Sequence, residues 1–240
     1  MAKLRPTKWI DTGWALPLLL FVSSFVAFAG SSLHTTWLWH LHQPIYWPDK
    51  RAGSEHCENA WDTIQQQDGG RLHPSPEILR NIFGVDDRRI AYQGGLRDSL
   101  NRITGYANAG VQVSYSGALM ENVQSLGSSG QLGYGGTWYQ PNQQARGWST
   151  SGGRTRLDLL NFTYHHALAP LLSDETLEME LRIHRRQMEI IWGTSPAVSR
   201  GYFPAETCFT ERMIPVLKKS ASNGPSWQTT TSRAPAPTFP

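Results

Sequence analysis

The sequence of 240 residues lacks several features that would place it in a functional class at once. It has only two cysteines, Cys57 and Cys208, too few for a disulfide framework, and we expect two buried free thiols. Its net charge is only +3, and residues 3–11 supply +2 of it, so the body of the chain is nearly neutral. Such a balance excludes nucleic acid as an expected partner. No internal repeat stands out, so a repeat architecture is not expected.

The chain also lacks an apolar run long enough for a comfortable membrane span. Its longest candidate, residues 15–29 (ALPLLLFVSSFVAFA), follows a positively charged start and ends in Ala27-x-Ala29 before Gly30. This order is typical of a secretory signal peptide. We therefore expect residues 1–30 to direct export to the periplasm or beyond the cell. The alternative is an uncleaved anchor, which would be the chain's contact with a membrane.

Aliphatic side chains larger than Ala or Pro are missing from residues 220–240 (SASNGPSWQTTTSRAPAPTFP). A segment of this composition cannot build a core element, so we expect it to be disordered. It begins abruptly after a helix-like pattern, which suggests a frameshift, because freely chosen codons can encode an apolar strand in another frame. Sequencing the encoding nucleic acid tests this hypothesis. Residues 31–219 remain as one domain.

Aromatic residues, by contrast, are plentiful, with ten Trp, eight Tyr and eight Phe, which suit both a core and stacking on sugar rings. Alternating and helical patterns predict an α/β fold, either a barrel or a doubly wound sheet. Ser173 followed by two acidic residues is a typical helix start. The expected strands cover 36–45, 111–116 and 198–203; the expected helices cover 77–83, 96–103, 173–192 and 210–219; the expected connections are a surface segment at 48–76 and a glycine-rich loop or lid at 127–153.

The segment HLHQPIYWP, residues 40–48, is the first candidate site. His40 and His42 follow an apolar strand and point to the same side, because side chains alternate along a strand. Gln43 and Trp47 add an amide and a flat apolar face, and this mixture predicts a ligand pocket. The spacing also suits a metal site, for which His165, His166, Asp86 and Asp87 are available further ligands. A third interpretation is that these histidines are hydrogen-bonded core residues.

The second candidate is Glu206, in the segment GYFPAETCFTERMIP of residues 201–215. A carboxylate just past a predicted strand lies at the strand's carboxyl end, where α/β folds place their sites. Phe203, Ala205 and Phe209 would partly remove it from water. Glu211 is expected to form an ordinary ion pair with Arg212. The alternative role for Glu206 is to cap the following helix.

Together these two segments resemble glycoside hydrolase family 57, whose members act on α-glucans by a retaining mechanism. Ser116 to Glu121 (SGALME) is similar to that family's second motif, and residues 164–171 (YHHALAPL) are similar to the segment that brings another histidine to the cleft. The resemblance covers about residues 35–219. It implies a partial (β/α)7-type barrel that lacks its C-terminal strands. It requires no cofactor and no metal.

The resemblance also implies the roles of individual residues. Glu206 falls where the family keeps its nucleophile, and Glu121 at a sugar-binding or site-shaping position. An α-glucan or malto-oligosaccharide is the implied substrate. The remaining implied substrate-binding residues are His40, His42, Gln43, Trp47, His165, His166 and Tyr202, with Trp39 and Tyr46 as further stacking faces.

The sequence departs from the family pattern at one point: no residue matches the aspartate that serves as general acid. We therefore expect a truncated chain that is weak or inactive alone. The first alternative is a non-catalytic glycan-binding remnant. The second is a metal-dependent hydrolase, such as a polysaccharide deacetylase, built on His40 and His42.

Overall fold

The computed structural model describes residues 35–49, 56–70 and 76–222. The predictions of a signal peptide and of a frameshifted tail lie outside these residues, except that helix α8 continues to Ser222. No helix among the described residues is long and apolar enough to cross a membrane.

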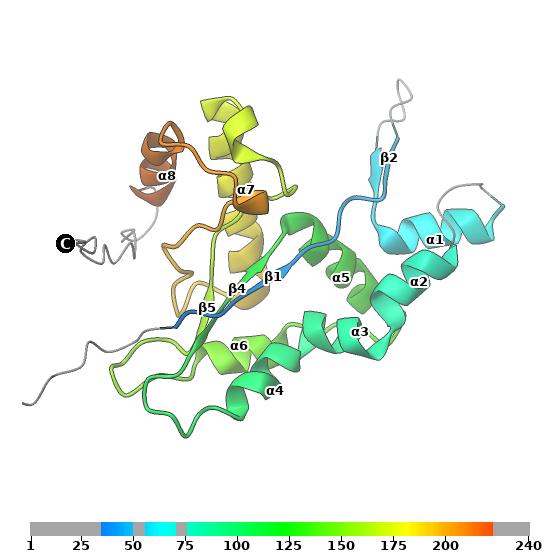
Figure 1. The fold of residues 1–240 in the computed structure, drawn as a ribbon. Helices are drawn as coiled ribbons and strands as arrows, with labels where there is room; N and C mark the ends of the chain where they lie inside the picture. The colour runs from blue at the N-terminus through cyan, green and yellow to red at the C-terminus, as the bar shows by residue number, and fades with distance from the viewer. Residues whose placement is uncertain (1–34, 50–55, 71–75, 223–240) are drawn as a thin grey trace, which may run out of the picture. The chain divides into compact units, whose positions relative to one another are not determined.

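A parallel sheet of three strands occupies the centre of the described fold (Figure 1). Its strands are β1 (Leu38–Leu41), β4 (Val111–Tyr115) and β5 (Leu157–Leu159), in the order β1-β4-β5. Trp39 of β1 lies opposite Val113 of β4, which sets the register. The predicted α/β class with a parallel sheet is confirmed, and closure into a barrel stays a prediction.

The segment 198–203, predicted as a strand, does not form a regular one. It runs beside β5 through backbone hydrogen bonds from Ser199 N to Leu159 O (2.9 Å) and from Phe203 N to Asn161 O (3.0 Å). A single parallel bridge joins Asn161 to Tyr202. The segment therefore extends the sheet by position without completing a fourth ladder.

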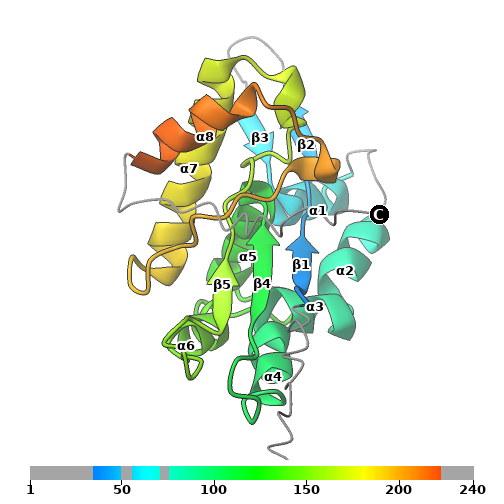
Figure 2. The same cartoon turned by 60° about the vertical axis from the view of Figure 1, so that its left-hand side comes forward.

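Eight α-helices and a hairpin surround the sheet within the described ranges. The hairpin pairs β2 with β3 in antiparallel fashion. Figure 2 shows the sheet from another side, with β1 and β4 pointing toward the segment that precedes α8. The remaining bounds are β2 (Trp47–Asp49), β3 (His56–Glu58), α1 (Ala60–Asp68), α2 (Pro76–Gly84), α3 (Asp86–Gln93), α4 (Gly95–Asn101), α5 (Gly117–Ser129), α6 (Gln140–Arg146), α7 (Asp174–Trp192) and α8 (Met213–Ser222), with 3-10 turns at Ala169–Leu171 and Ala205–Thr207.

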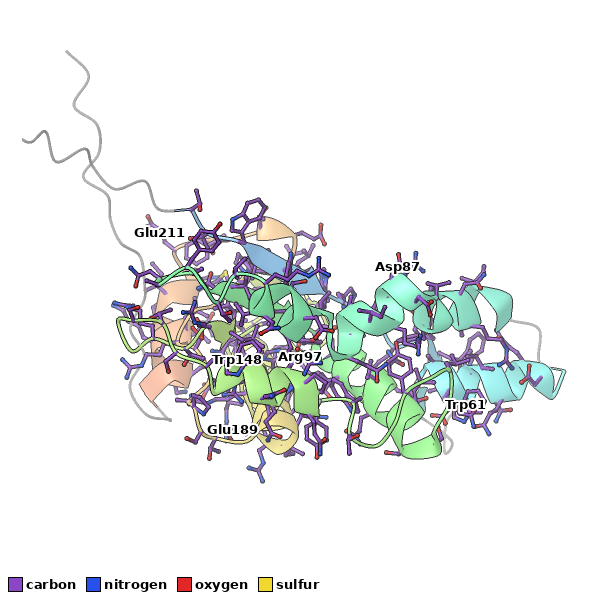
Figure 3. The ribbon with its side chains drawn as sticks, turned by 90° about the horizontal axis from the view of Figure 1, so that it is seen from below. Trp61, Asp87, Arg97, Trp148, Glu189 and Glu211 are labelled. Carbon is purple, nitrogen blue, oxygen red and sulfur yellow. The ribbon has the colours of Figure 1, made fainter. Side chains whose placement is uncertain are left out.

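The main core covers one face of the sheet. Side chains of the strands, among them Val113 and Leu159, pack there with residues of α4, α5, α6 and α7. Arg97, labelled in Figure 3, lies on α4 at the surface of this layer, and it donates to Gln144 of α6 (3.0 Å). A second, smaller cluster joins α7 to α8 and consists of Ala169, Leu177, Leu181, Met213 and Val216. Burial of the first core thus leaves the other face of the sheet for the site.

The expected surface connection at 48–76 is wrong in part, because it contains β2, β3 and helix α1. Asn59 begins α1 by accepting hydrogen bonds from Trp61 N (2.9 Å) and Asp62 N (3.1 Å). Ala60 and Ile64 of this helix are fully buried. The expected thiols are free, but Cys57 is exposed and Cys208 half-buried rather than both buried.

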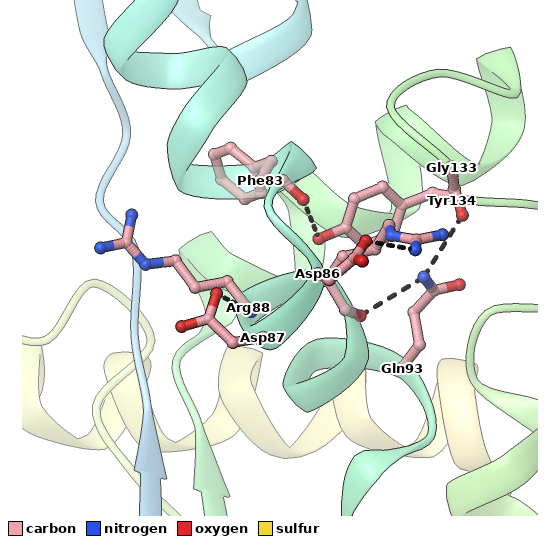
Figure 4. A network of polar contacts seen from close by, with 8 residues as sticks. Phe83, Asp86, Asp87, Arg88, Gln93, Gly133 and Tyr134 are labelled. Atoms are coloured by element: carbon pink, nitrogen blue, oxygen red, sulfur yellow. Dashed lines mark hydrogen bonds and ion pairs between the residues drawn. The ribbon is translucent and has the colours of Figure 1, made fainter.

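The predicted lid at 127–153 is likewise structured. Its first residues complete α5, and α6 lies within it. Tyr134 is buried and donates to the carbonyl of Phe83 (3.0 Å), while Gln93 Nε2 donates to the carbonyl of Gly133 (3.4 Å) (Figure 4). These contacts fix the connection against α2 and α3.

Candidate functional site

His40 and His42 lie on the face of the sheet away from the main core, as their spacing predicts. His40 Nδ1 is 2.7 Å from Ser114 Oγ, and His42 Nδ1 is 2.8 Å from Ser116 Oγ. Both serines are fully buried on or just after the neighbouring strand β4. Each serine holds one ring nitrogen, so the Nε2 edge of each histidine faces the site.

His166 joins these two rings from the segment that follows β5. Its backbone adopts a left-handed conformation, with φ +61°. Its Nε2 is 3.0 Å from His40 Nε2, and its ring stacks on that of His42 with a centroid separation of 3.9 Å. The three imidazoles therefore form one contiguous group, called the histidine cluster below.

Glu206 stands beside the histidine cluster, with its Oε1 3.6 Å from His166 Nε2. It lies in the 3-10 turn Ala205–Thr207, where Glu206 (φ +52°) and Thr207 (φ +57°) are both left-handed. Backbone in this region is strained for side chains with a Cβ and is held only by the surrounding structure. Such strain is frequent at functional sites, so the turn is a candidate reactive position.

The expected removal of Glu206 from water is wrong, because 67% of its side chain is exposed. Phe203 instead turns inward and packs on His40 at 5.5 Å between ring centroids. Phe209 is itself exposed. The apolar neighbours thus support the histidine rings rather than cover the carboxylate.

The expected ion pair of Glu211 with Arg212 is also replaced. Arg212 pairs with Asp174 at the start of α7 and donates to the carbonyl of Leu172 (2.7 Å). These contacts tie the segment after Glu206 to the loop that follows His166.

Burial makes His40 and His42 weakly basic. Desolvation, followed by the adjacent His166, lowers the pKa of His40 and of His42 from 6.5 to about 4. Both rings are therefore neutral at pH 7, and each offers one N–H donor and one acceptor. The short contact between His40 and His166 needs a proton on one Nε2 and a lone pair on the other.

Glu121 lies at the rim of the site on α5, and its carboxylate accepts a hydrogen bond from the Tyr164 hydroxyl. The Tyr164 ring lies directly on Gly117, where a Cβ would come within 2.1 Å of the ring. Only glycine permits this approach at the start of α5. Glu121 also borders a hollow of about 310 Å³, whose other lining residues include Ile45, Cys57, Asn59, Ser125 and Gln187.

His165 turns away from the histidine cluster, although its neighbour His166 enters it. Its Nδ1 is 2.6 Å from Glu180 Oε1 of helix α7, and its backbone N–H donates to Glu180 Oε2 (2.9 Å). The hydrogen bond with Glu180 raises the pKa of His165. The structure thus brings one of the two adjacent histidines to His40 and His42.

The remaining predicted residues take different places. Gln43 Nε2 donates to the Tyr92 hydroxyl (2.9 Å), and Gln43 Oε1 accepts from the Tyr46 hydroxyl. Tyr46 and Trp39 pack against the main core. Trp39 does so because neighbouring side chains of a strand point to opposite faces, and its neighbour His40 points to the site. Trp47 begins β2, outside the sheet of the histidines.

Tyr202 packs against the second cluster, and its hydroxyl is buried with no hydrogen-bond partner among the described residues. Its ring is therefore part of the packing beneath the site rather than an open stacking face.

The metal interpretation finds no support in the described part of the chain. It holds no group of three or more His, Cys, Asp or Glu side chains arranged to bind an ion. Asp86 and Asp87 lie on α3, where Asp86 pairs with Arg89 (2.7 Å).

The sequence did not indicate which residues hold His40 and His42 in place, nor which residue holds the loop after His42. Ser114 and Ser116 share the parity of one strand face, a signal that was available in the pattern Val-Gln-Val-Ser-Tyr-Ser. Asn122 accepts from Ala60 N (2.6 Å) and donates to the carbonyl of Pro44 (3.0 Å), so it fixes the loop after His42. No local pattern marks an asparagine for that role.

Known proteins are similar to this chain in sequence, and one solved structure was found to resemble part of it. Residues 36–227 match the model of glycosyl hydrolase family 57. An α-amylase from Niallia circulans is 36% identical over 119 residues, which cover 48% of this chain and 9% of that protein. The solved 4-α-glucanotransferase from Thermococcus litoralis is similar over 77% of this chain and 21% of its own, with 10% identity and a TM-score of 0.47. The chain thus spans a small part of either protein.

Proposed function

Because the chain belongs to glycosyl hydrolase family 57, we propose that it acts on α-glucans by a retaining mechanism with Glu206 as the nucleophile. The observation that carries this proposal is the placement of an exposed Glu206 carboxylate 3.6 Å from His166, beside His40 and His42. The name of the related α-amylase supports an α-glucan as the substrate. Malto-oligosaccharides are the smallest substrates of this class to test.

In a retaining mechanism the nucleophile attacks the anomeric carbon and forms a covalent glycosyl-enzyme, which water or a second sugar then resolves. The exposed Glu206 carboxylate is open to a sugar ring. A retaining mechanism also needs a general acid about 5–5.5 Å from the nucleophile. None of the described carboxylates is assigned that role.

The histidine cluster would bind sugar hydroxyls. A neutral imidazole can donate to one hydroxyl and accept from another, whereas a charged one only donates. The depressed pKa of His40 and His42 keeps both rings neutral at pH 7, so the nitrogen that does not contact serine can be a donor or an acceptor. Serine contacts at Nδ1 leave one nitrogen on each ring: Nε2 of His40 meets Nε2 of His166, and Nε2 of His42 is left to bind a sugar hydroxyl.

The test is turnover of an activated α-glucoside and of malto-oligosaccharides by the full chain and by Glu206→Gln. We expect the variant to lose roughly 10⁴-fold or more in kcat/KM, since the attacking group is removed. Glu211→Gln is the matched control, because Glu211 is an exposed carboxylate in the same segment. The control should retain the activity of the unaltered chain.

Product stereochemistry supplies the second measurement. NMR of the first product should show retention at the anomeric carbon, and inversion would contradict the mechanism. Activity that survives in Glu206→Gln would remove Glu206 from the role of nucleophile. Binding of malto-oligosaccharide without turnover by the unaltered chain would instead identify a glycan-binding protein.

A further inference from the structure

The segment 162–166 carries His166 from the end of β5 into the histidine cluster in an unfavourable conformation. The left-handed backbone of His166 is strained and persists only where its surroundings hold it. The turn is closed locally by a hydrogen bond from His166 N to Thr163 O (3.2 Å). One such bond adds only modest net stability, so contacts from outside the segment that hold the turn are of interest.

Glu180 of helix α7 provides the strongest of these contacts. Glu180 is only 5% exposed, and its two carboxylate oxygens accept from His165 N (2.9 Å) and from His165 Nδ1 (2.6 Å). The backbone N–H of Tyr164 is a further donor to the same carboxylate. One buried carboxylate therefore holds the two residues that immediately precede His166.

His184 lies one helical turn further along α7 and holds the start of the same segment. It is fully buried, its Nδ1 accepts from Phe162 N (3.4 Å) and its Nε2 donates to the carbonyl of Tyr115 (2.6 Å). Residues four apart share one face of a helix. α7 thus presents two buried polar side chains, Glu180 and His184, to a single stretch of backbone.

We propose that Glu180 is a positioning residue for the Glu206 site, acting through the backbone of Tyr164 and His165 to hold the His166 ring between His42 and Glu206. The inference rests on the proposed function, because it assigns His166 a part in binding substrate. Glu180 itself is separated from the reacting atoms by this segment.

The charge state of Glu180 suits this task. Burial by itself would raise its pKa, but the hydrogen bonds from His165 and from the backbone of Tyr164 lower the pKa overall. The carboxylate is therefore ionised at neutral pH, and an ionised carboxylate accepts stronger hydrogen bonds than an amide does.

The experiment compares Glu180→Gln with Glu178→Gln in the full chain. The glutamine keeps the shape of Glu180 but has one acceptor oxygen instead of two, so some of the hydrogen bonds to the segment 162–166 are lost. We expect kcat on a malto-oligosaccharide to fall by about 10²-fold, because catalysis is sensitive to displacements near 1 Å, with a smaller change in KM. Glu178 is on the same helix and pairs with Lys219 at the surface (2.6 Å), so Glu178→Gln should change neither value.

NMR separates this inference from the proposed function. The stacked His42 and His166 rings should give inter-ring contacts in the unaltered chain and in Glu178→Gln, and these should weaken in Glu180→Gln. This readout needs no turnover, so it is decisive even if the chain proves inactive. Unchanged ring contacts in a folded Glu180→Gln would overturn the proposal.

His165→Ala provides a second test in case the Glu180→Gln variant does not fold. It removes the ring contact with Glu180 but keeps the hydrogen bonds from the backbone N–H groups of Tyr164 and His165. If Glu180 acts through the backbone, His165→Ala should keep the contacts between His42 and His166. Loss of those contacts in His165→Ala would show that the imidazole of His165, rather than the backbone, transmits the effect.

Discussion

Single residues in unusual conformations define the candidate site. Among the described non-glycine residues with positive φ are His166, Glu206 and Thr207, all within the site. Each costs about 1–3 kcal/mol, so the rest of the fold has to hold them in place. The same surroundings remove His40 and His42 from water and keep them neutral. Protonation of His40 and His42 at acid pH is therefore expected to lower the free energy of unfolding.

We predict that the free energy of unfolding falls as pH drops from about 6.5 toward 4. The folded pKa of His40 and His42 is about 4, below the unfolded value of 6.5, so the unfolded chain binds protons first. The buried His184, with a pKa also lowered to about 4 by desolvation, acts in the same direction. Urea unfolding at several pH values should show a shallower decline in His42→Gln than in the unaltered chain.

His165→Gln provides a control of opposite sign. The pKa of His165 is raised, so its contribution is present below pH 6.5 and is lost as pH rises through the folded value. Removing it should make the decline toward acid pH steeper. Parallel pH curves for His42→Gln and the unaltered chain would refute the assignment of the lowered pKa to this site.

At the scale of elements, one side chain fixes the connection between α4 and β4. Arg156 is buried and donates to backbone carbonyls of this connection and to that of Ser149. Its Nε reaches Ser149 O (2.9 Å), and one terminal nitrogen reaches Tyr106 O (3.0 Å) and Ala109 O (2.7 Å). The other terminal nitrogen reaches Thr104 O (3.2 Å). The planar fork of a guanidinium can serve these acceptors together, whereas the ammonium of lysine cannot.

Arg156→Lys is therefore predicted to lower the free energy of unfolding by about 1–3 kcal/mol, because buried carbonyls lose their donors. Urea unfolding at pH 7 measures the change. Arg154→Lys is the matched control, since Arg154 is exposed two residues earlier, and it should unfold as the unaltered chain does. Equal midpoints for the two variants would show that the carbonyls are satisfied in another way.

The elements were predictable where local signals were strong. The predicted helix at 173–192 is confirmed as α7 with Ser173 as its N-cap, and the predicted strand at 111–116 is confirmed as β4 over Val111–Tyr115, since capping residues and alternation act over a few residues. Helix α6 and strand β5 were missed. β5 has only three residues and gains its stability from pairing with β4, a contact that sequence spacing does not reveal.

The whole described fold rests on two cores of unequal size. The main cluster joins the sheet to most of the helices, whereas the second holds only five buried residues between α7, α8 and the turn at Ala169–Leu171. A small cluster loses fewer contacts when it opens. We expect α8 to open locally while β4 remains closed.

A matched pair of substitutions tests this difference. Met188 belongs to the main core and Met213 to the second cluster, and both are fully buried. Met188→Ala should lower the global free energy of unfolding by about 2–5 kcal/mol and speed hydrogen exchange in β4. Met213→Ala should speed exchange in α8 while β4 changes little. Equal acceleration of β4 in both variants would show that the two cores unfold as one unit.

The sequence by itself determined the α/β class, the common direction of His40 and His42, and the position of Glu206 after a strand-like segment. These follow from periodicity and from the order of elements, which act over short distances along the chain. Only the tertiary structure decided that His166 rather than His165 joins His40 and His42. It also decided that Glu180 and His184 hold the segment 162–166, which carries His166. The physical reason is that helix α7 meets the segment after β5 only in the folded chain, and folding brings together residues whose separation in sequence carries no signal of their contact.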